Sequence, residues 1–238
     1  EGTRINDEER EESEDKVYKD SSKIVSSTER LVLADFNFKD VDRLRTFYNV
    51  AKENGRKFVV KLNDAYFLKW LSKDPKLNVP KIDDDDIIIY VPKKKSGTYS
   101  DSDYKGKEDQ FVSRNNAWTA EQLAVKESKV LCAIGFFSFT ALIDIKPDPG
   151  AVYIHSASEP YNEEQVIDQK RIDNWVEHFG MNKFQSHCSG HARGKDLLEA
   201  VSEIGAKMLF PIHTEHPDAY RKITQKITLV KEAVKYEL

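Results

Sequence analysis

The sequence has few cysteines and no long hydrophobic segment, and both shortages narrow the class of protein. Only two of its 238 residues are cysteines, Cys132 and Cys188, which is too few for a disulfide framework. We therefore expect a reducing, cytoplasmic setting. The longest apolar run covers residues 130–145 and is shorter than the ~20 residues that span a bilayer. No membrane segment and no signal peptide are expected.

An excess of charge of one sign is also missing. The chain has 37 Lys and Arg against 41 Asp and Glu, which gives a formal net charge of −4. No global basic field therefore indicates a nucleic-acid partner, although a local basic groove is compatible with an acidic protein. With 39% hydrophobic residues, the chain can bury a real core in one large domain or two smaller ones.

The first half of the chain alternates apolar runs with helical patterns. Residues 6–28 are highly charged, which indicates a solvated helix or a partly disordered lead-in. Buried strands are expected at residues 31–36, 57–62 and 86–92, with single-face helices between them. This order predicts an α/β fold in which these three parallel strands are adjacent and helices cover both faces.

The second half continues the α/β pattern after a polar interruption. Residues 93–116 interleave lysines with tyrosines, and we expect a long loop that is functional or mobile. Further strands are expected at residues 130–135, 151–156 and 207–213, and further helices at 119–127, 162–180 and 195–204. The chain is expected to end in a helix or a strand.

Four of the six histidines lie between His187 and Pro217. His213 closes the expected strand at 207–213, and ligand residues favour the carboxyl ends of strands in α/β sheets. His191 follows a tight turn, Ser189–Gly190, that could present an imidazole together with backbone N–H groups. Taken alone, each of these histidines, like His155 at another strand end, fits an ordinary structural role better than a catalytic one.

Two other features suggest metal binding only superficially. Cys188 is not half of a zinc ribbon, because the chain has no C-x-x-C motif. The acidic run Asp83–Asp86 lacks the glycine and the spaced ligands of a calcium loop, so a solvated turn is expected there.

Three short motifs, taken in order, resemble the β-CASP family of metallo-β-lactamase-fold nucleases. "EGTRI" at Glu1 is similar to the E-x-T motif, "SGHA" at His191 to the next motif and "PIHTE" at His213 to the last. Glu1 and His191 are 190 positions apart, and His191 and His213 are 22 apart. In the β-CASP family an inserted domain, the β-CASP cassette, separates the first two of these motifs, and the longer spacing fits an insertion of that size. Residues 35–60 and the stretch "SASEPYNEE" at 156–164 also resemble the cassette of archaeal ribonuclease J-like proteins.

The resemblance implies a division of the chain into three parts. Residues 1–5 would end the first half of a metallo-β-lactamase domain, residues 6–185 would form the β-CASP domain, and residues 186–238 would be the last metallo-β-lactamase segment. It also implies the activity, which is hydrolysis of phosphodiester bonds in single-stranded RNA with two metal ions, usually zinc. The protein is also expected to form a homodimer.

The resemblance also assigns roles to residues. His213 would be a metal ligand, and His191 would lie near the scissile phosphate, held by Glu1. A carboxylate beside an imidazole fixes its tautomer and favours its protonated form, which can donate to the leaving oxygen.

Phosphate contacts are expected in the same region. The expected phosphate-binding residues are Ser189, Gly190, Ser156 and Ser158. Weaker candidates for contacts to the RNA backbone are Arg43, Arg56 and Lys93–Lys95.

The family's main metal-binding motif, H-x-H-x-D-H, does not occur in the sequence. A catalytic zinc normally has three protein ligands or more, so this chain alone is expected to be inactive and to be part of a longer protein. Two alternatives stay open. One is a β-CASP-like module that binds RNA without cutting it. The other is an unrelated α/β phosphoesterase, in which Glu1 would have no role.

Overall fold

The computed structural model describes residues 2–6 and 12–236, and the chain divides into two compact units. Unit 1 consists of residues 1–12 and 189–238, and unit 2 of residues 13–188. The boundaries predicted from the sequence lie between residues 5 and 6 and between residues 185 and 186. The assignment of the units to a metallo-β-lactamase domain and a β-CASP domain stays a prediction.

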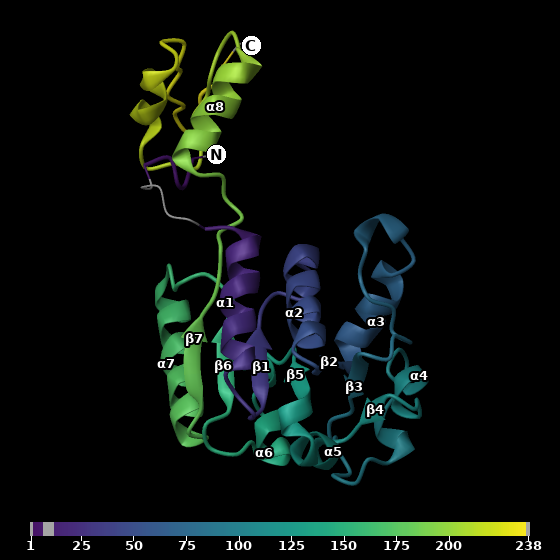
Figure 1. Cartoon of the computed structure of the whole chain (residues 1–238). Coiled ribbons are helices and arrows are strands. Elements are labelled where there is room, and N and C mark those ends of the chain that lie inside the picture. Colours follow the sequence, from purple (N-terminus) through teal and green to yellow (C-terminus); the bar gives the residue numbers. More distant parts are fainter. Residues whose placement is uncertain (1, 7–11, 237–238) are drawn as a thin grey trace. The chain divides into compact units, whose positions relative to one another are not determined.

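Unit 2 is built on one seven-stranded sheet in which all strand pairs are parallel (Figure 1). The strand order is β4-β3-β2-β5-β1-β6-β7. The strands are β1 (Val32–Asp35), β2 (Lys57–Lys61), β3 (Ile87–Tyr90), β4 (Ala117–Trp118), β5 (Val130–Cys132), β6 (Val152–His155) and β7 (Asn182–Gln185).

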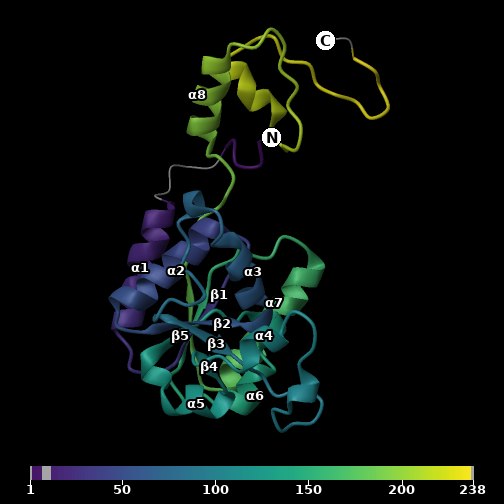
Figure 2. The same ribbon diagram turned by 90° about the vertical axis from the view of Figure 1, so that its right-hand side faces the viewer.

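Helices cover both faces of this sheet (Figure 2). Successive strand side chains point to opposite faces, so Val32 packs in one core and Leu33 in the other. The first core is closed by α1 (Glu14–Ser26), α2 (Val41–Glu53), α3 (Leu62–Leu71) and the short α4 (Asp109–Val112). The second is closed by α5 (Ala120–Val125), α6 (Ala141–Ile145) and α7 (Glu163–His178).

The expected α/β class, a parallel sheet between helices, is confirmed, but one expected pairing is wrong. β2 and β3 are neighbours, whereas β5 lies between β1 and β2. Local hydrophobic patterns indicate where strands form. They do not indicate that a strand about 100 residues later will insert between two earlier ones.

The charged N-terminal region contains a well-formed helix. α1 begins after Ser13, whose hydroxyl accepts a hydrogen bond from the Lys16 N–H at 3.1 Å. Its sparse apolar positions, including Val17 and Val25, are buried within unit 2. Residues 7–11 of the expected lead-in lie outside the described residues.

The polar segment 93–116 is more ordered than a long loop. It contains a short 3-10 helix (Asp101–Asp103) and α4, and the side chains of Tyr104 and Phe111 are buried in the first core. Two large aromatic rings provide enough apolar area to hold a polar segment on the sheet.

Unit 1 contains α8 (Gly194–Ile204) and a 3-10 helix (Pro217–Lys222). The expected strand at 207–213 is wrong, because this segment forms only one isolated bridge, between Leu209 and Ile227. A strand needs a neighbour that accepts and donates its backbone hydrogen bonds, and the described residues provide only that bridge. The part of the chain that follows Lys222, as far as residue 236, forms no regular helix or strand.

The remaining short 3-10 helices connect elements of unit 2. They are Pro75–Leu77, Glu127–Lys129 and Phe136–Ser138. Within residues 2–6 and 12–236, no helix is long and apolar enough to cross a membrane.

Candidate functional site

The N-terminal segment of unit 1 is bonded to the segment around His213. The backbone N–H of Gly2 donates to the carbonyl of His213 at 3.1 Å. The hydroxyl of Thr214 donates to the carbonyl of Gly2 at 3.0 Å. Two motifs more than 200 residues apart are therefore joined by backbone contacts. Glu1 itself lies outside the described residues.

The same N-terminal segment lies against the start of α8, just after the "SGHA" motif. A Cβ atom added at Gly194 would overlap the carbonyl group of Ile5. Gly194 is buried, and only a residue without a side chain leaves room for this close approach. All three motifs thus come together within unit 1.

The two motif histidines are neighbours in this arrangement. The ring centroids of His191 and His213 are 6.5 Å apart, and both residues are exposed. His213 has a φ of 53°, a left-handed conformation that non-glycine residues rarely adopt and that often marks functional positions. The N–H of His191 donates to the hydroxyl of Ser189 at 3.2 Å, so this turn fixes the start of the motif.

These two imidazoles do not make a complete zinc site. Within the described part of the chain, no three His, Cys, Asp or Glu side chains are grouped so that they could hold a metal ion. A catalytic zinc needs at least three protein ligands. The described residues therefore do not fit a zinc ion by themselves, and we assign no reaction step to a metal.

A second polar cluster lies in unit 2, at the carboxyl ends of the central strands. The carboxylate of Asp35, at the end of β1, accepts hydrogen bonds from the Phe136 N–H at 3.0 Å and the Tyr153 hydroxyl at 2.6 Å. A Cβ at Gly135 would overlap this carboxylate. This edge of a parallel α/β sheet is where ligands usually bind.

His155, at the end of β6, extends this cluster. Its Nδ1 lies 3.0 Å from the Tyr153 hydroxyl and 3.9 Å from the Asp35 carboxylate. Burial lowers the pKa of His155 below its usual value, although the charge of Asp35 opposes that effect. Burial, together with Asp35, raises the pKa of the Tyr153 hydroxyl. Burial therefore favours the neutral form of the His155 imidazole.

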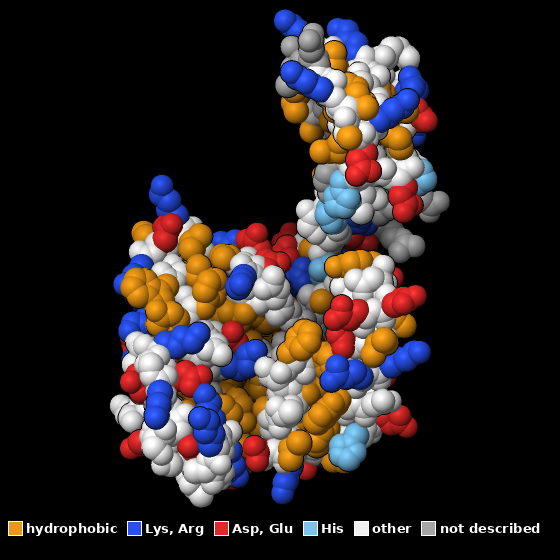
Figure 3. Space-filling view, turned by 180° about the vertical axis from the view of Figure 1, so that it is seen from behind, with side chains coloured by type: hydrophobic (Ala, Val, Ile, Leu, Met, Phe, Trp, Pro, Cys, Tyr) orange, Lys and Arg blue, Asp and Glu red, His pale blue; other side chains and the backbone are white. Residues whose placement is uncertain are grey.

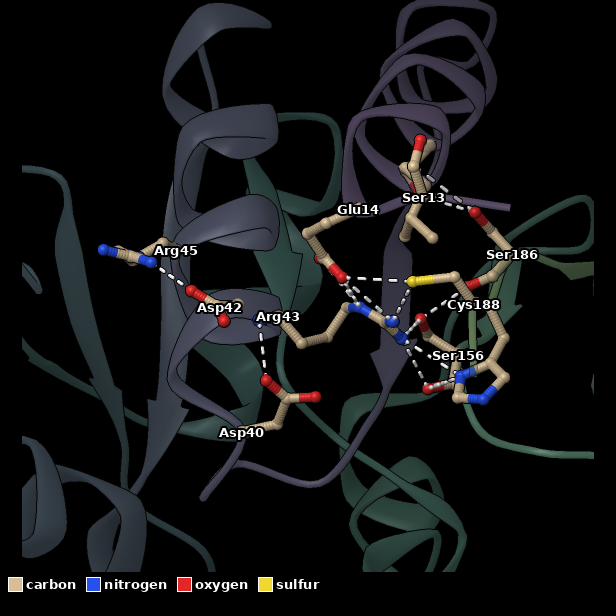
Figure 4. Close-up of polar contacts among 12 residues, drawn as sticks. Ser13, Glu14, Asp40, Asp42, Arg43, Arg45, Ser156, Ser186 and Cys188 are labelled. Carbon is tan, nitrogen blue, oxygen red and sulfur yellow. Dashed lines mark hydrogen bonds and ion pairs between the residues drawn. The ribbon is translucent and has the colours of Figure 1, made fainter. Parts of the chain in front are cut away.

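Arg43 is the centre of a third polar cluster (Figure 4). Its guanidinium group is buried and makes an ion pair with Glu14, in which Nε lies 2.9 Å from Oε1 and Nη2 lies 3.1 Å from Oε2. It also donates to the carbonyl of Ser156 at 3.0 Å and contacts the sulfur of Cys188 at 3.4 Å. Its Nη1 lies 3.3 Å from Nδ1 of His187. The cluster ties the start of α1 to the segments after β6 and β7.

The expected phosphate-binding serines of unit 2 differ in their surroundings. Ser156 is buried, and its hydroxyl accepts from Arg43 and donates to the carbonyl of Ser186. A phosphate contact would have to replace these bonds. Ser158 is exposed. Ser189 and Gly190 belong to unit 1, so the structure groups them with His191 and His213 and not with Ser156.

The weaker RNA-contact candidates are mostly engaged within unit 2. Arg43 and Arg56, two of the weaker candidates for contacts to the RNA backbone, are buried and are not solvated surface groups. Arg56 donates to the carbonyls of Arg30 and Val130, both at 2.9 Å. Lys93 and Lys94 pair with carboxylates of Glu121 and Glu108. These internal partners leave the four side chains few N–H donors for contacts to an RNA phosphate.

Sequence reasoning missed the Asp35 and Arg43 clusters. An acidic residue directly after an apolar run, as in "LVLADF", indicates a side chain at the carboxyl end of a buried strand, where ligands often bind. His155 carries the same signal at the end of "AVYIH". For Arg43 there was no local signal, because its partners lie on three separate segments of the chain.

Comparison with known proteins supports the fold but indicates no function. No family model matches the sequence, and no curated protein matches it. Among solved structures, the chain is similar to a protein of unknown function from Enterococcus faecalis V583, with 17% sequence identity and a TM-score of 0.68. The match covers 98% of this chain and 49% of that one, so the chain spans about half the length of this neighbour.

Proposed function

We propose that this chain carries the β-CASP cassette and the last metallo-β-lactamase segment of a ribonuclease, and that the complete protein hydrolyses phosphodiester bonds of single-stranded RNA. The observation that carries the proposal is the meeting of the three motifs in unit 1. Gly2 bonds to His213, Ile5 packs on Gly194, and His191 lies beside His213. An unrelated phosphoesterase would give no reason for the N-terminal motif to take part.

In this proposal each motif residue has a role. His213 is a metal ligand whose companion ligands come from outside the described residues. His191 contacts the scissile phosphate and acts as proton donor, while Glu1 orients its ring. Ser189 and Gly190 contact phosphate beside His191 in unit 1, and Ser156 and Ser158 remain proposed phosphate contacts of unit 2. The zinc ions, the cytoplasmic location and a homodimer belong to the same proposal.

The surface of unit 1 supports the view that more chain packs on it. α8 has Leu197, Leu198 and Val201 on its surface, but its only buried residue is Gly194. Ile204 is 74% exposed and Ile212 is 56% exposed. Figure 3 shows hydrophobic side chains spread over the surface of this unit. An apolar surface of this kind usually marks an interface.

The test is RNA cleavage by the longer protein that contains this chain and the segment encoded before it. We expect that protein to shorten a labelled single-stranded RNA and to lose this activity with a chelator, whereas residues 1–238 alone leave the RNA intact. RNA binding without cleavage by the longer protein would favour the non-catalytic alternative. Neither binding nor cleavage would refute the proposal.

A further inference from the structure

An aromatic pair lies on α3, outside the clusters described above, and one of its two rings is exposed. Tyr66 and Trp70 are one helical turn apart, and their ring centroids are 6.2 Å apart at 64°. Trp70 is 52% exposed, which is unusual for the largest apolar side chain. α3 begins directly at the carboxyl end of β2, the same edge of the sheet that carries Asp35 and His155.

Lysines surround these rings. The Nζ of Lys73 lies 3.6 Å from the ring centroid of Trp70, and the Nζ of Lys107 lies 5.6 Å from that of Tyr66. Lys69, on the same helix, lies 5.9 Å from the ring of Phe111. We call Tyr66, Lys69, Trp70, Lys73 and Lys107 the α3 ring surface. Lys107 belongs to the segment in which the sequence interleaves lysines with tyrosines.

The lysines of the α3 ring surface differ from their neighbours in one respect. Lys93 and Lys94 also lie near tyrosine rings, but each is paired with a carboxylate. Within the described residues, Lys69, Lys73 and Lys107 form no ion pair. The nearby acid Asp64 pairs with Lys61, and Asp74 accepts from the Lys76 N–H. Lys69 donates to the side-chain oxygen of Gln110, and no carboxylate of the described residues pairs with any of the three ammonium groups, so an external anion can approach them.

We propose that the α3 ring surface binds single-stranded RNA. A nucleotide has a flat base next to a phosphate, and the surface offers a half-exposed indole, a partly buried phenol and three cations. Bases stack on aromatic side chains without sequence preference, and lysines neutralise the adjoining phosphates. The choice of RNA rests on the proposed function. The surface would hold a stretch of the substrate on unit 2.

The experiment measures binding of a fluorescein-labelled single-stranded RNA of mixed sequence to residues 1–238 by fluorescence anisotropy at several salt concentrations. We expect Trp70→Ala to weaken binding at least roughly fivefold and Trp70→Phe to retain most of it, because phenylalanine still offers a ring. Lys73→Gln and Lys107→Gln should each reduce the slope of log K against log salt by about 0.7.

Lys126→Gln is the matched control. Lys126 also lies over an indole, with its Nζ 4.1 Å from the ring centroid of Trp118, but it belongs to a different surface. This variant should bind RNA like the parent chain. Trp70 is half exposed, so its variants should keep the parent's circular dichroism spectrum and melting temperature, which are measured alongside.

Several results would overturn the proposal. They are no RNA binding by residues 1–238, equal binding of double-stranded RNA, or unchanged affinity in folded Trp70→Ala and Lys73→Gln. The binding assay does not require cleavage. If the longer protein fails to cut RNA but residues 1–238 bind it through Trp70, the proposed function fails and this surface stands. If the longer protein cuts RNA and the Trp70 variants bind normally, only this surface fails.

Discussion

Arg43 shows how much one buried side chain contributes to unit 2. Burial alone would raise the pKa of its partner Glu14, but hydrogen bonds from Arg43 and Thr46 bring that pKa below its usual value. An ion pair broken on one side leaves the other charge uncompensated. Because Arg43 joins the start of α1 to the segments after β6 and β7, its loss should loosen all three.

We therefore expect Arg43→Ala to lower the free energy of unfolding by about 3 kcal/mol. Arg45→Ala is the control, because Arg45 is more exposed, pairs with Asp42 (Figure 4) and makes one long hydrogen bond, 3.3 Å, to the Leu77 carbonyl, so its loss should cost less than about 1 kcal/mol. Urea unfolding followed by circular dichroism measures both. Equal costs for the two variants would show that the Arg43 cluster does not stabilise unit 2.

His155 should make stability depend on pH. Its pKa is lowered in the folded chain, chiefly by burial, so the unfolded chain takes up the proton first as the pH falls below about 6.5. The contribution of the neutral ring is fully present above that value and is lost as the pH decreases. The free energy of unfolding should thus fall more between about pH 7.5 and about pH 5.5 in the parent chain than in His155→Gln. A parallel decline in both proteins would exclude His155 as the cause.

The sequence predicts only some of the residues in the polar clusters, because some lie in short motifs and others are identified only by their tertiary contacts. His191, His213 and Ser189 stood out because each lies in a short motif. Arg43 and Arg56 occupy positions in helical and turn patterns that usually face solvent, and only the tertiary structure shows that they are buried. Asp35 could have been found from its place at the end of an apolar run, whereas its bonds to Phe136 and Tyr153 could not.

At the scale of elements, local patterns predicted strands better than their order. The runs that became β1, β2 and β3 were long enough and apolar enough to be recognised. Their neighbours were set by packing across the sheet, which placed β5 between β1 and β2. The segment 207–213 has the composition of a strand but has only one bridge partner. Composition therefore predicted the class, and long-range pairing decided the topology.

Gly194 tests the contact between the N-terminal segment and α8. A methyl group there would overlap the Ile5 carbonyl, so Gly194→Ala should destabilise unit 1 by about 1–3 kcal/mol. Gly190→Ala is the control, because a Cβ there meets open space, and its effect should stay within about 0.5 kcal/mol. Hydrogen exchange at residues 2–6 is the readout. Unchanged protection in Gly194→Ala would mean that this contact does not hold the segment.

In the whole molecule, the neighbouring residues His191 and His213 have different proposed roles, so their variants should have different effects. In the longer protein, His191→Ala should lower the single-turnover rate of RNA cleavage by roughly 10²–10⁴-fold, because a proton donor and phosphate contact is removed. His216→Ala is the control, since His216 is an exposed histidine in the same region without an assigned role. Equal rates for His191→Ala and the parent would remove His191 from the site.

The most direct test of the central claim is the zinc content of the longer protein and its variants, measured by mass spectrometry after exhaustive dialysis. We expect His213→Ala to lose bound zinc, because a ligand is removed, and His191→Ala and His216→Ala to retain the parent's content. Zinc that is unchanged in His213→Ala, or lost in His191→Ala, would contradict the claim that these motifs form one edge of a metal-dependent RNA-cleaving site.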